Sequence, residues 1–100
     1  MNLLRLDLTT SFERAQRAED PHRFLAGKIA GKLERVAPSL YERNLPFEAG
    51  EAESLAQRFR DEGDFHDCWA DLVEWGEAVV VSGGREKSLC KISDLPRELA

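Results

Sequence analysis

The order of apolar and polar positions at the start of the chain predicts two short elements. Leucines alternate with polar residues over about residues 2–9, which predicts a strand with one buried face. Thr10 and Glu13 then have the spacing of a capping box, in which each side chain bonds to the other's backbone amide. They predict a short helix over residues 10–18.

A longer apolar stripe at helical spacing follows. Asp20 can accept a hydrogen bond from exposed amides, and Pro21 suits the first helical position, where its missing N–H is not needed. We therefore expect a helix from Asp20 to residue 37, ended by Pro38. Residues 38–50 are rich in turn-forming residues, and they predict a connection that packs onto the core.

Two further stripes predict two more helices in the middle of the chain. Residues 51–62 carry the first, and Gly63 is placed to end it in a left-handed conformation. Asp64 can cap the second helix, which we expect to run to about residue 76.

The pattern then changes to one typical of strands. Ala78–Val81 is β-branched, Gly83 and Gly84 allow a tight turn, and residues 88–92 can return as a second strand. This predicts a β-hairpin over residues 78–92. The expected fold class is therefore α+β, with an N-terminal strand, three to four helices and a C-terminal β-hairpin.

Length and composition restrict the remaining possibilities. One hundred residues are enough for a single domain, residues 1–100. Arg5 and Asp7 interrupt the N-terminal apolar run, so we expect neither a signal peptide nor a membrane span. Cys68 and Cys90 form neither a disulfide framework nor a Cys-x-x-Cys pair, which indicates a cytoplasmic protein with reduced thiols.

The charge is concentrated in one segment. The chain has 14 basic and 19 acidic residues, a net charge of −5. Residues 48–77 alone carry 2 basic and 10 acidic side chains, a net −8, so all other residues together sum to +3. The overall sign disfavours bulk binding to nucleic acid or to anionic lipid.

The helix expected from residue 64 carries carboxylates three or four residues apart, with no Lys or Arg between them. Such a face is either simply solvated or a docking surface for a basic partner, and the docking surface is our hypothesis. An aromatic residue beside it would be an interface anchor, although packing in the core is the alternative for each aromatic residue of this helix. The partner-binding candidates are Asp64, Asp67, Asp71, Glu74, Glu77 and Trp75, with Phe65 as a further contact.

Basic residues line one side of the helix expected over residues 20–37. Lys28, Lys32 and Arg35 follow each other at helical spacing beside the apolar stripe. They either neutralise the acidic helix within the fold or remain in water.

Other groups of residues fit no catalytic or metal site. The segment from Gly27 to Leu33 lacks the spacing of a phosphate-binding loop and its magnesium-binding hydroxyl. Gly27 and Gly31 instead predict a close approach of another backbone. His66, Cys68 and Cys90 have no fourth ligand at zinc spacing. We therefore expect no enzyme, no catalytic residue, no metal and no cofactor.

These observations favour a small inhibitor or adaptor that docks an anionic helix face, residues 61–77, on a basic surface of a partner protein, such as a nucleic-acid-binding groove. Phage-encoded inhibitors, anti-CRISPR proteins among them, act in this manner, although no motif in this chain is specific to them. As an alternative, the element order resembles a winged helix-turn-helix, a nucleic-acid-binding or transcription-regulating domain that would use the hairpin 78–92. Direct DNA binding is disfavoured, because the second helix carries acids where base contacts need Arg, Lys, Asn or Gln.

Overall fold

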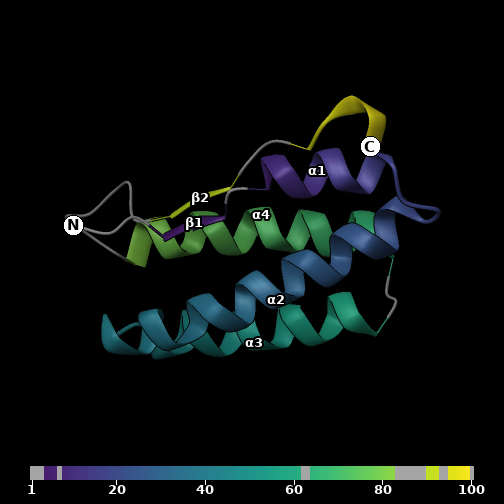
Figure 1. Cartoon of the computed structure of the whole chain (residues 1–100). Coiled ribbons are helices and arrows are strands. Elements are labelled where there is room, and N and C mark those ends of the chain that lie inside the picture. The colour runs from purple at the N-terminus through teal and green to yellow at the C-terminus, as the bar shows by residue number, and fades with distance from the viewer. Residues whose placement is uncertain (1–3, 7, 62–63, 83–89, 93–94, 100) are drawn as a thin grey trace.

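The computed structural model of the chain describes residues 4–6, 8–61, 64–82, 90–92 and 95–99. Four helices make up most of this part, and two short strands and a 3-10 turn complete it (Figure 1). The elements in chain order are β1 (Leu4–Leu6), α1 (Thr9–Gln16), α2 (Pro21–Glu42), α3 (Pro46–Arg60), α4 (Phe65–Ser82), β2 (Cys90–Ile92) and the 3-10 turn η1 (Arg97–Leu99).

The predicted α+β class is wrong, because the described part of the chain is helical. Residues 78–82, the expected first arm of the hairpin, are the end of α4. Val79 is fully buried, and it continues the stripe of Leu72 and Trp75 into the core. The strand preference of valine spans only about 1 kcal/mol, so packing in the core overrides it. The turn expected at residues 83–84 lies outside the described residues.

The strands form one short parallel pair and no layer of their own. Each has three residues, and Leu4 pairs with Cys90 and Leu6 with Ile92. β1 contacts α2 and β2 contacts α4, so the pair lies against the helices. Of the strand expected over residues 2–9, residues 4–6 form β1 and Thr9 already begins α1, while residues 2, 3 and 7 lie outside the described residues. The winged-helix alternative loses the hairpin on which it depended, because residues 78–82 are helical.

Helix α2 begins as predicted and continues past its expected end. The Asp20 side chain accepts a hydrogen bond from the Arg23 amide at 3.2 Å, and Pro21 occupies the first turn. Pro38 lies inside the helix, which continues to Glu42. Pro38 is exposed, so water can reach the backbone carbonyl that it leaves unpaired, while Leu40 is fully buried in the core.

A tight turn replaces the connection expected over residues 38–50. Asn44 has a φ of 61°, the left-handed conformation that asparagine tolerates better than most residues. The Leu45 amide donates to the Leu40 carbonyl at 2.9 Å, and the Asn44 amide donates to the Tyr41 carbonyl at 3.1 Å. This is a Schellman motif, which ends α2 and lets α3 begin at Pro46, five residues before the predicted start.

The other helix boundaries also differ from the sequence-based expectation. α1 begins at Thr9 after Leu8, whose side chain makes no cap, so the predicted capping box does not form. Gly63 lies outside the described residues. The Asp64 side chain accepts from the His66 amide at 2.9 Å and caps α4 as predicted.

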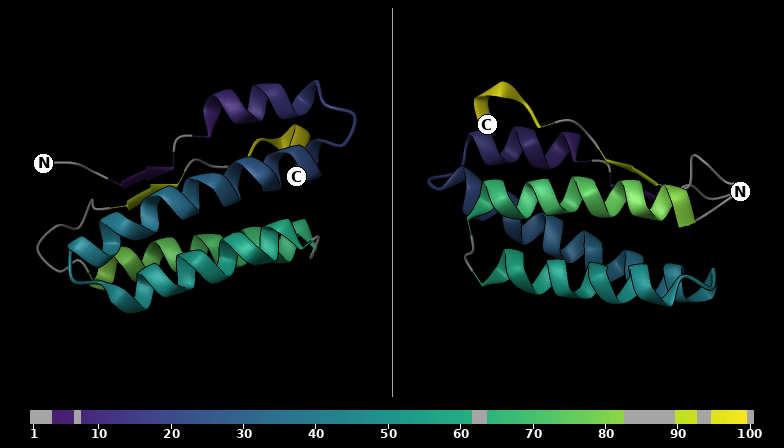
Figure 2. Two further views of the ribbon diagram at one scale, coloured as in Figure 1. Left: turned by 60° about the horizontal axis from the view of Figure 1, so that its bottom comes forward. Right: turned by 180° about the vertical axis from the view of Figure 1, so that it is seen from behind.

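Small side chains bring α2 and α3 together, and these two helices form the most extensive contact in the fold. Both contribute buried alanines, which allow a close approach of helix axes. α4 packs beside α3, and α1 lies on the other side of α2 and α4 (Figure 2). At 1.5 Å per residue α2 is about 33 Å long, most of the 40 Å length of the molecule. The buried alanines are Ala26, Ala30 and Ala37 of α2 and Ala49, Ala52 and Ala56 of α3.

Candidate functional site

Helix α4 divides into a buried apolar side and an exposed acidic side. Cys68 and Leu72 are buried in the core, with Phe65, Trp75 and Val79 on the same side. The exposed side carries carboxylates, two alanines and Val73, which is 39% exposed. The exposed acidic residues of α4 are Asp67, Glu74 and Glu77.

Those three carboxylates are exposed to solvent. Among the described residues, no Lys or Arg forms an ion pair with Asp67, Glu74 or Glu77. Within the part of the chain that the structure describes, this side of α4 therefore presents carboxylates to solvent that no Lys or Arg contacts directly. All three side chains are exposed, as the sequence predicted, whereas their role in binding stays a prediction.

Asp64 lies at the N-terminal end of this acidic surface, and its main role is to cap α4. Its carboxylate caps α4 and lies 3.7 Å from Nδ1 of His66. A carboxylate at a helix N-terminus also interacts favourably with the helix dipole. Asp64 therefore stabilises the start of α4, while much of its side chain remains exposed to solvent.

Asp71 is paired within the chain. It accepts a hydrogen bond from Arg58 of α3, and both side chains remain about half exposed. The hydrogen bond from Arg58 to the Asp71 carboxylate raises the pKa of Arg58 above its ordinary value. Exposed pairs of this kind stabilise a protein by only about 0–1 kcal/mol, so the pair can open at small cost.

Trp75 is a core residue, and its predicted role as a surface anchor does not fit its position. It is 2% exposed, and its indole Nε1 donates to the backbone carbonyl of Glu48 at 2.9 Å. Phe65 is likewise buried, stacked against Trp69 with ring centroids 6.2 Å apart. The aromatic residues of α4 therefore hold the helix in place.

A shallow groove between α3 and α4 extends the acidic surface. It encloses about 380 Å³, and Glu51, Arg58, Asp71 and Glu74 supply its charged lining. Three carboxylates against one guanidinium give the groove a net charge of −2. Ala78 also lines it.

Glu51 belongs to this groove and was missed from the sequence. α3 and α4 run antiparallel, and Arg58 of α3 lies opposite Asp71 of α4. Glu51 lies two turns before Arg58, and Ala78 lies two turns after Asp71, so Glu51 and Ala78 also lie opposite each other. The helix boundaries would have to be known before this relation could be seen in the sequence.

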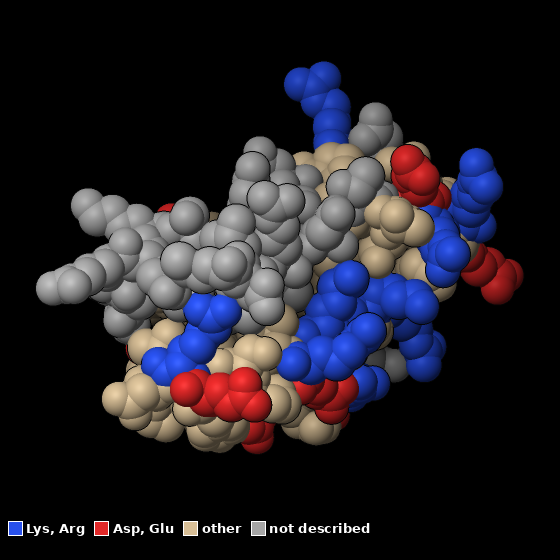
Figure 3. Space-filling view, turned by 60° about the vertical axis from the view of Figure 1, so that its left-hand side comes forward, with Lys and Arg blue, Asp and Glu red and all other residues tan. Residues whose placement is uncertain are grey.

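The basic residues of α2 do not neutralise the acidic surface. Lys28, Lys32 and Arg35 form no ion pair with a described residue. Lys28 Nζ lies 5.5 Å from the centre of the Phe24 ring, and Arg35 Nε donates to the Gly31 carbonyl at 3.3 Å. Lys and Arg side chains gather on one face of the molecule (Figure 3).

The remaining sequence-based candidates do not come together as a metal site among the described residues. No group of three His, Cys, Asp or Glu side chains there is placed to hold a metal ion. His22 and His66 come together, with ring centroids 5.1 Å apart, but His22 Nε2 is bonded to the Leu99 carbonyl. Burial raises the pKa of the Cys68 thiol, which disfavours the reactive thiolate.

The predicted close approach at the glycines of α2 is wrong. A Cβ added at Gly27 would meet no atom within 4 Å, and one at Gly31 would meet only the Arg35 guanidinium at 3.7 Å. No neighbouring backbone therefore requires a glycine at either position.

Comparison with known proteins gives no family for this chain. No protein-family model, curated protein or solved structure matches it. Within the described residues, no helix has both the length and the apolar character needed to cross a lipid bilayer.

Proposed function

We propose that this protein is a small non-enzymatic binding module of the cytoplasm, an inhibitor or adaptor, that presents the acidic surface of α3 and α4 to a basic partner protein. The observation that carries the proposal is the set of three exposed carboxylates, Asp67, Glu74 and Glu77, none of which forms an ion pair with a described Lys or Arg. A concentrated negative field accelerates and orients the encounter with a cationic surface.

The groove beside these carboxylates indicates how a partner segment would lie. Ala70 and Ala78 are exposed and small, so a helix or extended segment can approach α4 closely. Its basic groups would meet Glu74 and Glu51, and the weak Arg58–Asp71 pair would open to release a further carboxylate. A nucleic-acid-binding groove of the partner has the required positive charge, which agrees with the action of an inhibitor of such a protein.

A charge-matched pair of variants tests this proposal. The surface variant carries Asp67→Asn, Glu74→Gln and Glu77→Gln. The control carries Glu13→Gln, Glu19→Gln and Glu42→Gln, three exposed acids away from the groove, so both variants have the same net charge. Tagged wild-type protein is used to capture binding proteins from host extract, and each captured protein is then purified and titrated against all three forms.

We expect a basic partner whose affinity falls at least about tenfold for the surface variant, which corresponds to roughly 1.4 kcal/mol. The control should bind like the wild type, and wild-type affinity should decrease with added salt. Equal affinity of the surface variant and the wild type would contradict the proposal. So would equal losses in both variants, because net charge alone would then explain the binding.

A further inference from the structure

Helix α2 carries a stripe of positive charge along one face. Lys28, Lys32 and Arg35, the basic stripe, follow each other at intervals of four and three residues, so they lie on the same side of the helix. Lys28 and Arg35 are exposed, and Lys32 is partly exposed. None of the three forms an ion pair with a described residue. The basic stripe therefore presents three cationic groups that no described carboxylate contacts.

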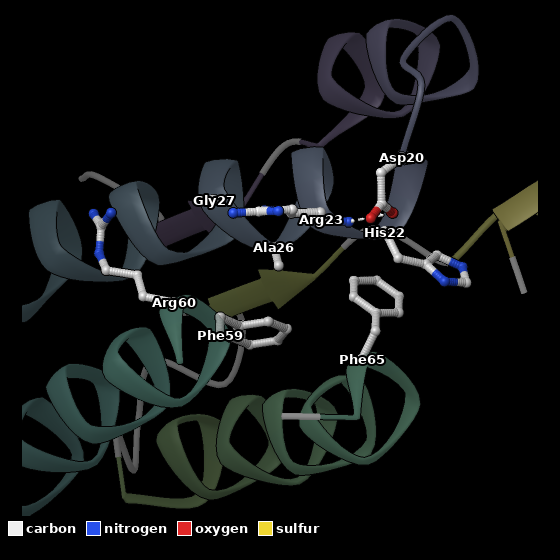
Figure 4. Close-up of a pocket in the computed structure, with 8 residues that line it drawn as sticks. All are labelled: Asp20, His22, Arg23, Ala26, Gly27, Phe59, Arg60 and Phe65. Atoms are coloured by element: carbon white, nitrogen blue, oxygen red, sulfur yellow. Dashed lines mark hydrogen bonds between the residues drawn. The ribbon is translucent and has the colours of Figure 1, made fainter. Parts of the chain in front are cut away.

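The surroundings of the basic stripe do not compensate its charge. Arg35 donates from Nε to the Gly31 carbonyl, which leaves its terminal nitrogens for another acceptor. Glu34, the acidic residue nearest in sequence, pairs instead with Arg60 of α3. The Arg60 side chain points toward α2 (Figure 4). An anionic surface that meets the basic stripe thus finds three positive charges to neutralise.

Helix α4 repeats the spacing of the basic stripe with the opposite sign. Asp67, Asp71 and Glu74, the acidic stripe, also follow each other at intervals of four and three residues. Arg58 bonds to Oδ2 of Asp71, and no described Lys or Arg pairs with the other two carboxylates. Three carboxylates and one guanidinium leave the acidic stripe a net charge of −2. The two stripes are therefore complementary in charge and equal in spacing.

Small residues lie at matching positions between the charges. When Lys28 is aligned with Asp67 and both helices run in the same direction, Gly31 lies opposite Ala70, which is exposed. Gly31 makes α2 less stable than alanine would, and a Cβ there would meet only the Arg35 guanidinium. No contact within the fold requires this glycine, whereas two helices approach most closely where their facing side chains are small.

The two stripes do not pair with each other within one molecule, as the absence of ion pairs between described residues of α2 and α4 shows. We propose that the basic stripe of one copy of this chain binds the acidic stripe of a second copy, with the two helices parallel. The ion pairs of this contact are Lys28–Asp67, Lys32–Asp71 and Arg35–Glu74. Because the contact joins two different surfaces, each copy can bind a neighbour through either stripe, and the association either continues as an open chain or closes into a ring.

This association is weak and depends on salt. Exposed ion pairs contribute little each, and the net charge of −5 on every copy opposes the approach. At about 0.1 M salt the Debye length is about 10 Å, which screens repulsion between distant charges more than attraction between groups in contact. A bound copy covers Asp67 and Glu74, so self-association and the proposed basic partner exclude each other. The inference itself does not depend on the existence of that partner.

Sedimentation equilibrium of the full chain over a range of concentrations measures the association, with no other protein present. Two variants each remove one stripe and leave the other intact. The first carries Lys28→Gln, Lys32→Gln and Arg35→Gln, and the second carries Asp67→Asn, Asp71→Asn and Glu74→Gln.

A charge-matched control separates the contact from the effect of net charge. It carries Arg14→Gln, Arg17→Gln and Arg97→Gln, three exposed arginines of α1 and η1, so its net charge equals that of the basic-stripe variant. Circular dichroism establishes that every variant is folded.

At about 0.1 M salt, we expect the apparent mass of the wild type and of the control to rise with concentration. The association constant should fall at least about tenfold in each stripe variant. An equimolar mixture of the two stripe variants holds one intact stripe of each sign, so it should form a 1:1 pair that grows no further. Association of the wild type should decrease at about 1 M salt.

A wild type or an equimolar mixture that remains monomeric would overturn the proposal, and so would an equal loss in the control. A monomeric wild type that binds a labelled DNA duplex would assign the basic stripe to a polyanion instead. These results differ from a failure of the proposed function, because capture of a basic partner is measured separately.

The alignment of the helices has its own test in Gly31→Leu. The larger side chain should hold the two helices apart and weaken association at least about fivefold, whereas Gly50→Leu in α3 should associate like the wild type. Equal association of both leucine variants would overturn the close approach at Gly31. Should a variant not fold, amide shifts of the wild type between dilute and concentrated solution locate the contact. Shifts centred on Gly31 and Ala70 support it, and shifts confined to other elements overturn it.

Discussion

The indole nitrogen of Trp75 donates a hydrogen bond to the backbone carbonyl of Glu48, 2.9 Å away and 27 residues earlier in the chain. This bond joins the middle of α4 to the first turn of α3. It also explains the inward position of Trp75, because a buried indole N–H needs an acceptor. The acidic surface of α4 is therefore oriented by a contact on the opposite side of the same helix.

Trp75→Phe should lower the free energy of unfolding by about 1–3 kcal/mol, because it removes this hydrogen bond and part of a buried ring. Trp69→Phe is the matched control, since Trp69 is only partly buried and its ring contacts involve Phe12 and Phe65. Urea unfolding followed by circular dichroism measures both variants. A loss in Trp75→Phe no larger than that in Trp69→Phe would show that the bond contributes little.

The ion pair between Arg58 and Asp71 should contribute little to the free energy of unfolding. A double-mutant cycle with Arg58→Ala and Asp71→Ala is expected to give a coupling energy below about 1 kcal/mol in urea unfolding, because both groups are about half exposed. The coupling should decrease further at high salt. A coupling of several kcal/mol would mean that Asp71 is not available to a partner.

Replacing helical glycines by alanine should stabilise the protein. Gly27→Ala and Gly50→Ala are each expected to raise the free energy of unfolding by about 0.4–1 kcal/mol, since the methyl group meets no atom and the unfolded chain loses conformational freedom. Thermal and urea unfolding both report this change. A destabilised variant at either position would indicate that a neighbour fills the space.

The Cys68 thiol should be protected in the folded protein. In a Cys90→Ser background, Cys68 should react with Ellman's reagent about a hundredfold or more slowly than in urea, because it is 1% exposed and burial raises its pKa. A rapid reaction at neutral pH would contradict its buried position.

The same pKa change makes stability depend on pH. The thiol is deprotonated first in the unfolded chain, so its contribution is complete below the usual thiol pKa of about 8.5 and is lost as the pH rises through the higher folded value. The fall in unfolding free energy between neutral and alkaline pH should therefore be smaller in Cys68→Ala than in the wild type. Equal falls in both proteins would refute this assignment.

Local signals in the sequence were sufficient for the starts of α2 and α4 and for most of the core. Asp20 and Pro21 begin α2 as expected, and Asp64 caps α4. The stripes through Leu25 and Leu72 are buried as their spacing indicated. These features depend on interactions within one or two helical turns, which the sequence displays directly.

The errors arose where contacts distant in sequence outweigh local preference. Pro38 was expected to end α2, but it lies on the exposed side while Leu40 is held in the core. Val79 was expected in a strand, but its burial beside the rest of the core keeps it helical. Trp75 was named as an interface candidate with core packing as the alternative, and the core position holds because another helix supplies its hydrogen-bond acceptor, which the sequence does not display.

The regular geometry of α4 sets a fixed distance between its free carboxylates. Asp67 and Glu74 are separated by seven residues, about 10.5 Å along the helix axis, and Glu77 follows about 4.5 Å further on. A ligand that engages all three must carry cationic groups at that same pitch. Lysines or arginines two turns apart on a second helix meet the longer spacing, and so do residues three apart on an extended segment, about 10 Å, whereas neighbouring residues of that segment, about 3.3 Å apart, do not.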